Sequence, residues 1–161
     1  MAVSQLILTH RGSPATGSSP VVTLALLGSA RDAGTVSVDV DVSAGQLNVH
    51  FHGWDKVIAL FSHTTAPLSS VLGARAMQAD DAHKDARGLH KAAGTGIPGR
   101  VKAGAWGTGG RRQLWCWHRE EEVLVVDLAG HRYTRMVLNV RDPGATARAI
   151  TVALPVVRHA P

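Results

Sequence analysis

Alternating apolar and polar positions predict a β-hairpin near the start of the folded region. Residues 36–42 alternate valine with polar side chains, and residues 47–51 alternate Leu, Val and Phe with polar side chains. A period of two places each apolar set on one face of a strand. A two-residue turn at Ala44-Gly45 then pairs Val42 with Leu47 and Asp39 with His50. All the apolar residues of the hairpin share one face in this register.

The same pattern predicts five more strands and a long loop. The apolar run of residues 54–61 is too short to assign to a helix or a strand. The charged, glycine-bearing segment 79–99 has no clear period and is predicted to be a surface loop. Tyr133 is out of phase with the apolar positions after it, which indicates a bulge near Arg135. The five further strands are expected around residues 66–77, 100–106, 113–118, 123–128 and 133–140.

A C-terminal helix is predicted after the last strand. Asp142 is a favoured N-cap residue and Pro143 suits the first helical position. Ala149, Ile150, Ala153 and Leu154 form one apolar stripe, and the following proline ends the helix. The domain is therefore mainly β, with about seven strands in a three-plus-four arrangement and one closing helix.

This order of elements resembles the pleckstrin-homology-like (PH-like) fold. Several stretches are also similar to uncharacterised bacterial proteins with PH-like domains, and the similarity covers about residues 36–154. The resemblance implies two near-orthogonal antiparallel sheets, closed as a small barrel by a C-terminal capping helix. It also implies a binding role, and it assigns no catalytic residue. The matching stretches are residues 53–61, 67–71, 87–89, 94–99, 103–104, 123–128 and 133–143.

The positive charge of the chain is concentrated in one segment. The formal net charge is +5, and residues 75–112, with eight Lys or Arg and three Asp, carry the same excess. A basic region is typical of proteins with an anionic partner, although it also serves solubility. The candidate ligand-binding residues are Arg87, Lys91, Arg100, Lys102, Arg111 and Arg112.

Two histidines offer a weaker metal-binding alternative. His50 and His52 lie two residues apart on one strand face, a spacing that can chelate a metal, with Asp39 across the hairpin as a third ligand. A solvated face on which histidine pairs with aspartate explains the same residues. The only cysteine, Cys116, is expected to be a buried apolar residue rather than a nucleophile.

Three tryptophans are candidates for a ligand-binding face. Trp115 and Trp117 share one strand face, which Trp106 joins from the neighbouring strand, close to arginines. Such rings either contact a ligand or belong to the core under the long loop. The G-x-G-x-x-G pattern at residues 94–99 precedes a strand and contains Pro98, so no dinucleotide cofactor, and no other cofactor, is expected.

These observations predict three regions and one main function. Residues 1–34 form a flexible extension, 35–155 the PH-like domain and 156–161 a short tail. The apolar run 21–27 has the outline of a signal peptide, but cytoplasmic location is favoured. The expected function is non-catalytic binding of an anionic ligand or a protein partner, with an acidic membrane surface as a variant. The alternatives are a metalloprotein or enzyme and a homo-oligomeric structural protein; nucleic acid, supported by charge alone, is not expected.

Overall fold

The first sheet is the predicted hairpin with one added strand. The computed structural model describes residues 38–52, 63–119 and 121–155. The sheet consists of β1 (Val38–Ser43), β2 (Gln46–Phe51) and β3 (His63–Pro67), all antiparallel. The pairing of β1 with β2 follows the predicted register. Ala44 and Gly45 have φ of 50° and 74°, as a type I′ turn requires. The hairpin prediction is confirmed.

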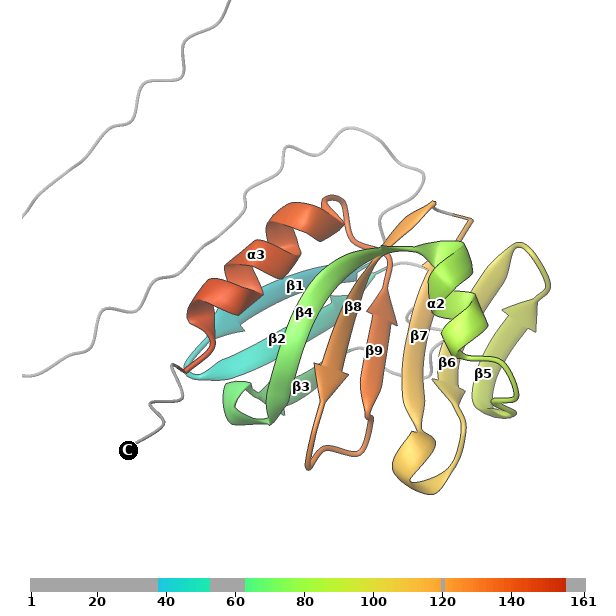
Figure 1. Cartoon of the computed structure of the whole chain (residues 1–161), viewed down its shortest axis with the longest axis horizontal. Helices are drawn as coiled ribbons and strands as arrows, with labels where there is room; N and C mark the ends of the chain where they lie inside the picture. The colour runs from blue at the N-terminus through green and yellow to red at the C-terminus, as the bar shows by residue number, and fades with distance from the viewer. Residues whose placement is uncertain (1–37, 53–62, 120, 156–161) are drawn as a thin grey trace, which may run out of the picture.

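The second sheet has six strands in the order β4-β8-β9-β7-β6-β5. Neighbouring strands are antiparallel except β7 and β9, which run parallel. The prediction of seven strands divided three plus four was therefore wrong, because the described residues form nine strands in sheets of three and six. The two sheets are not joined into a closed barrel in this part of the chain (Figure 1). The strands are β4 (Val71–Gln78), β5 (Lys91–Ile97), β6 (Val101–Trp106), β7 (Gln113–His118), β8 (Glu122–Leu128) and β9 (Arg135–Leu138).

The segment predicted as a single third strand is two strands in different sheets. A short 3-10 turn, η1 (Leu68–Ser70), separates β3 from β4. The hydroxyl of Ser70 donates a hydrogen bond to the carbonyl of Pro67 at 2.7 Å and closes this turn. The chain passes from the first sheet to the second here, so one apolar run serves both sheets.

The predicted loop of residues 79–99 contains a helix and a strand. Helix α2 spans Ala79–Asp85, and β5 follows it. The helix buries Ala79 and Ala82, whose small side chains give little apolar signal in the sequence. Strand β5 depends on a glycine pair, because a Cβ on Gly94 would lie 2.1 Å from the carbonyl oxygen of Ala103. Because alanine and glycine give no clear apolar period, the sequence pattern did not indicate either the helix or the strand.

The last strand is shorter than predicted and has no bulge. It begins at Arg135, pairs in continuous register with both neighbours, and leaves Tyr133 in the preceding connection. Tyr133 is buried in the core between the two sheets. Its place outside the strand explains why it was out of phase.

The C-terminal helix has the predicted start and end. Helix α3 spans Pro143–Ala153, and the side chain of Asp142 accepts a hydrogen bond from the amide of Ala145 at 2.7 Å. Its buried face presents Ala147 and Ile150 to the core, whereas the predicted Ala149 is only partly buried. The helix packs on β4, β8 and β1 (Figure 1).

Replacement of Asp142 with alanine is expected to lower the free energy of unfolding by about 1 kcal/mol, because the first turn of α3 loses its cap. Urea denaturation of both proteins measures the difference. An Asp142→Asn variant, which keeps a cap acceptor, should stay within about 0.5 kcal/mol of the wild type. An equal loss in both variants would contradict capping as the cause.

The core has two parts, one on each face of the six-stranded sheet. The larger part lies between the two sheets and α3, and includes Phe51, Leu114, Cys116 and Tyr133. The smaller part lies under α2 and contains Trp115 and other residues of the opposite face. The extension 1–34, the tail 156–161 and the apolar run 54–61 fall outside the described residues. Among the described residues, no helix is long and apolar enough to cross a bilayer.

Candidate functional site

The tryptophan face of the six-stranded sheet lies beside α2. Lys102 on β6 stands opposite Gly96 on β5 and Trp117 on β7, so these three residues share one face. Trp115 lies further along β7 on the same face and is fully buried under α2. The predicted shared face of the tryptophans is confirmed, and its cover is the helix in the segment predicted as a loop.

A small pocket of about 240 Å³ opens between α2 and the β5–β6 hairpin. Its walls are mostly aromatic or apolar, and only two of its lining side chains are titratable. The ring of Trp106 lies over Gly96, where a Cβ would be 2.8 Å from ring atom Cη2. Gly96 therefore makes room for the ring. The lining includes His83, Gly96, Ile97, Lys102, Trp106 and Trp117, and we call this site the Lys102 pocket.

Lys102 is a partly buried cation held by aromatic rings. Its Nζ lies 3.5 Å from the ring centroid of Trp115 and 4.8 Å from that of Trp106. Such contacts favour the ammonium form. Burial acts in the opposite direction and lowers the pKa of Lys102 to about 8. Within the described residues, no carboxylate forms an ion pair with this ammonium group.

A second donor in the pocket also lacks a partner. The indole Nε1 of Trp106 is buried and has no hydrogen-bond acceptor in the described part of the chain. An unmade hydrogen bond of a buried group costs about 1–3 kcal/mol. The ammonium of Lys102 differs from this indole N–H, because it is only partly buried and has no ion-pair partner in the described residues. A ligand with acceptor oxygens in the pocket would pair with the ammonium of Lys102.

His83 is the other titratable group of the pocket, and α2 supplies it. Its ring centroid lies 4.8 Å from that of Trp115 and 4.4 Å from that of Trp117. Its Nδ1 is 2.7 Å from the carbonyl oxygen of Ala79, which can only accept, so Nδ1 carries the proton. Burial lowers the pKa of His83, and the charge of Lys102 lowers it further. His83 is therefore neutral at pH 7, with Nε2 as an acceptor.

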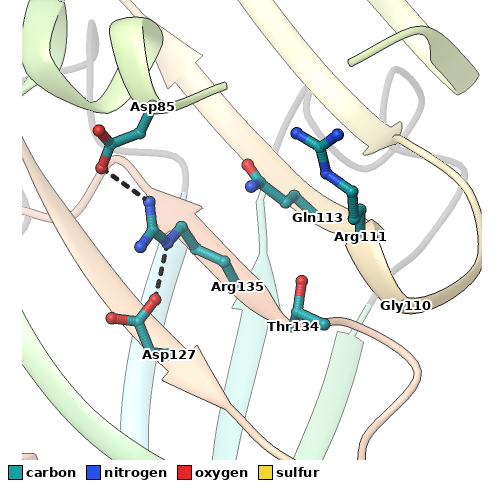
Figure 2. Close-up of a pocket in the computed structure, with 7 residues that line it drawn as sticks. All are labelled: Asp85, Gly110, Arg111, Gln113, Asp127, Thr134 and Arg135. Atoms are coloured by element: carbon teal, nitrogen blue, oxygen red, sulfur yellow. Dashed lines mark hydrogen bonds and ion pairs between the residues drawn. The ribbon is translucent and has the colours of Figure 1, made fainter. Parts of the chain in front are cut away.

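A second, polar pocket of about 350 Å³ lies on the same sheet face, beyond the C-terminal end of α2 (Figure 2). The guanidinium of Arg135 pairs with two carboxylates. Its Nε lies 2.7 Å from Oδ1 of Asp127, and its Nη1 lies 3.0 Å from Oδ2 of Asp85. Arg75 pairs with the other oxygen of Asp127. Burial raises the pKa of Asp127, but the hydrogen bonds and charges of the two arginines together lower it below its usual value. The carboxylates and guanidinium groups of this pocket are therefore paired with one another. Arg111, on the other side of the pocket, is exposed.

The six predicted basic residues do not form one surface. Arg87, Lys91, Arg100 and Arg111 are exposed, at the end of α2, on β5 and in two turns. Arg112 lies near the opposite face of the sheet, with its guanidinium 5.7 Å from the ring centroid of Tyr133. Of the six predicted basic residues, only Lys102 lines the Lys102 pocket.

The hairpin histidines pair with aspartates separately. His52 lies 2.9 Å from Asp39, and His50 lies 3.5 Å from Asp41. No three His, Cys, Asp or Glu side chains come together as a metal site within residues 38–52, 63–119 and 121–155. The structure therefore does not bring His50, His52 and Asp39 into the predicted set of three ligands, and it favours the aspartate-paired face.

His83 and residues 96–99, all of which line the pocket, were missed by sequence reasoning. His83 was assigned to a loop, and residues 96–99 were considered only as part of a nucleotide-binding pattern. In the structure these residues form the end of β5 and the turn into β6, and they line the pocket. The alanines at positions 79, 82 and 86, spaced three and four apart, were the signal for the helix that carries His83.

Comparison of the chain with protein-family models, with curated proteins and with solved structures returns no match.

Proposed function

We propose that this protein is a non-catalytic module that binds a small organic anion in the Lys102 pocket. One observation carries the proposal: the ammonium of Lys102 is partly buried among aromatic rings in this pocket, and no carboxylate in the described residues forms an ion pair with it. A carboxylate or phosphate supplies an anionic partner for this ammonium group, and charge-assisted hydrogen bonds are the stronger kind. The apolar part of the ligand then lies against Trp106, Trp117 and Ile97.

The pocket volume limits the size of the ligand. About 240 Å³ is below the usual range of about 300–1,000 Å³ for ligand pockets. The occupant is therefore a small aromatic or aliphatic acid, or the acidic end group of a larger molecule. Aromatic walls favour a flat ligand that stacks or makes edge contacts.

The other predictions from the sequence stand beside this proposal. The capping helix agrees with a PH-like fold, whereas the parallel pair β7–β9 and the six-stranded sheet differ from the arrangement expected for it. A protein partner, an acidic membrane surface, a homo-oligomer and a cytoplasmic location stay predictions of the sequence.

The test compares benzoate and phenyl phosphate with the neutral isostere benzamide. We expect both anions to bind, as measured by calorimetry at pH 7, and benzamide to bind at least about tenfold more weakly, because a hydrogen bond to a charged group contributes about 1.5–3 kcal/mol. Lys102→Met should weaken anion binding by a similar factor. Lys91→Met, an exposed lysine of the same region, is the matched control and should bind as the wild type does. Equal binding of benzoate by both variants would refute the proposal.

Binding should also depend on pH with a definite sign. The anion binds the ammonium form, which is fully present below the free-state pKa of about 8 and is lost above it. Affinity for benzoate is therefore expected to fall about tenfold between pH 7 and pH 9. The same calorimetric titrations at the two pH values measure this change. An affinity that rises or stays constant would show that Lys102 does not carry the binding.

A further inference from the structure

We propose that the Lys102 pocket is also a covalent site, in which the amine of Lys102 condenses with an aldehyde or ketone to form an imine. This inference uses the same pocket as the proposed function but not the anion. The two therefore succeed or fail independently, since one is measured as reversible binding of benzoate and the other as a bond to Lys102.

The surroundings of Lys102 suit an amine nucleophile. Uncharged groups face it from three strands: Gly96 from β5, Trp106 from its own strand and the two tryptophans of β7. The titratable group that faces the same pocket from α2 is His83. No carboxylate in the described residues holds the amine in its protonated form, and burial disfavours the charge. A substantial fraction of the amine is therefore neutral near pH 7.5.

The other lysines differ in this respect. The chain contains four, Lys56, Lys84, Lys91 and Lys102. The Nζ of Lys84 is 2.7 Å from a carboxylate oxygen of Asp81, and that hydrogen bond raises the pKa of Lys84. Lys91 is exposed at the start of β5. Within the described residues, the combination of an aromatic pocket and an unpaired amine belongs to Lys102.

The chemistry balances without a co-reactant. The nitrogen lone pair of neutral Lys102 attacks the carbonyl carbon, and the carbonyl oxygen takes a proton to give a carbinolamine. Loss of water from this adduct forms the C=N bond. Neutral His83 holds an acceptor nitrogen in the same pocket, so it can take the proton that leaves the amine and return it to the departing oxygen. The tryptophan rings cover part of the amine and favour an aromatic carbonyl compound.

The experiment traps the imine in the full-length protein. Benzaldehyde is added at pH 7.5 with sodium cyanoborohydride, which reduces the imine to a stable benzylamine, and peptide mass spectrometry locates the label. We expect Lys102 to be labelled at least about tenfold faster than Lys84, because its amine is neutral far more often. The α-amino group, with a usual pKa of about 7.7–8.0, is a second reactive amine and appears in a separate peptide.

Two variants separate a site effect from general reactivity. Lys102→Arg keeps the positive charge, removes the nucleophile and should abolish the label at this position without new labelling elsewhere. His83→Gln should slow labelling of Lys102 and flatten its dependence on pH, whereas a purely structural role would leave the shape of that dependence unchanged. Equal labelling rates at Lys84, Lys91 and Lys102 in the wild type, a comparison that needs no variant to fold, would overturn the proposal.

Discussion

Lys102→Met is expected to stabilise the protein at pH 7 by about 1–2 kcal/mol while it removes anion binding. The pKa of Lys102 is about 8, against about 10.4 for an ordinary lysine, which corresponds to roughly 3 kcal/mol before solvent screening. Loss of the contacts with the Trp106 and Trp115 rings offsets about 0.5–2 kcal/mol of this gain. Methionine has a similar length and no charge to bury.

The gain in stability should disappear as the pH rises. The folded-state pKa of Lys102 is lower than the unfolded one, so the unfolded chain binds the proton more tightly between about pH 8 and pH 10.5. The cost of burying the charge is complete below pH 8 and is lost above it. Urea denaturation at pH 7 and pH 10 measures the free energies of unfolding. Lys91→Met should change stability by less than about 0.5 kcal/mol at both values; a destabilised Lys102→Met would contradict the account.

Asp127→Ala is expected to destabilise the protein by about 2–3 kcal/mol. The carboxylate joins Arg75 of β4 to Arg135 of β9 from the strand between them. Its removal leaves two guanidinium groups partly buried without their main partner, a loss of about 3–5 kcal/mol for a fully buried pair. The side chain of Asp127 is 25% exposed, and solvent screening reduces the figure.

The matched control for Asp127 is Asp85, the other partner of Arg135. Its side chain is 50% exposed, so Asp85→Ala should cost less than about 1 kcal/mol. The pKa of Asp127 is lowered on folding, so its contribution is present above the unfolded value of about 3.9 and is lost as the pH falls through the folded value. Urea denaturation of Asp127→Ala and Asp85→Ala at pH 7 measures the two losses in the free energy of unfolding. Equal losses at Asp85 and Asp127 would argue against a central role for Asp127.

Where the sequence predicted the fold, a few residues with strong local preferences decided it. The Ala44-Gly45 turn and the alternating valines determine the first hairpin, and Asp142 with Pro143 determines the start of α3. Helix α2 and β5 were missed because alanine and glycine carry little of the apolar pattern. The parallel pairing of β7 with β9 brings together distant parts of the chain, which no local pattern records.

The sequence identified residue types that belong to the candidate site, but it did not predict how they are arranged in space. The basic segment contained Lys102, and the tryptophan face was correct, yet the two were treated as separate features. Only the register that sets Lys102 between Gly96 and Trp117 distinguishes this lysine from exposed neighbours such as Arg100. His83 joins the site through α2, so it could not be assigned before that helix was known.

The most direct test of the central claim is a pH titration of Lys102 by NMR, with and without benzoate. The four lysines give four side-chain ¹³Cε signals in protein labelled with ¹³C-lysine, and Lys102→Met assigns the relevant one. We predict a pKa near 8 for Lys102 in the free protein and a higher pKa when benzoate is bound, because the anion favours the ammonium form. An ordinary pKa of about 10.4 that benzoate does not change would contradict it.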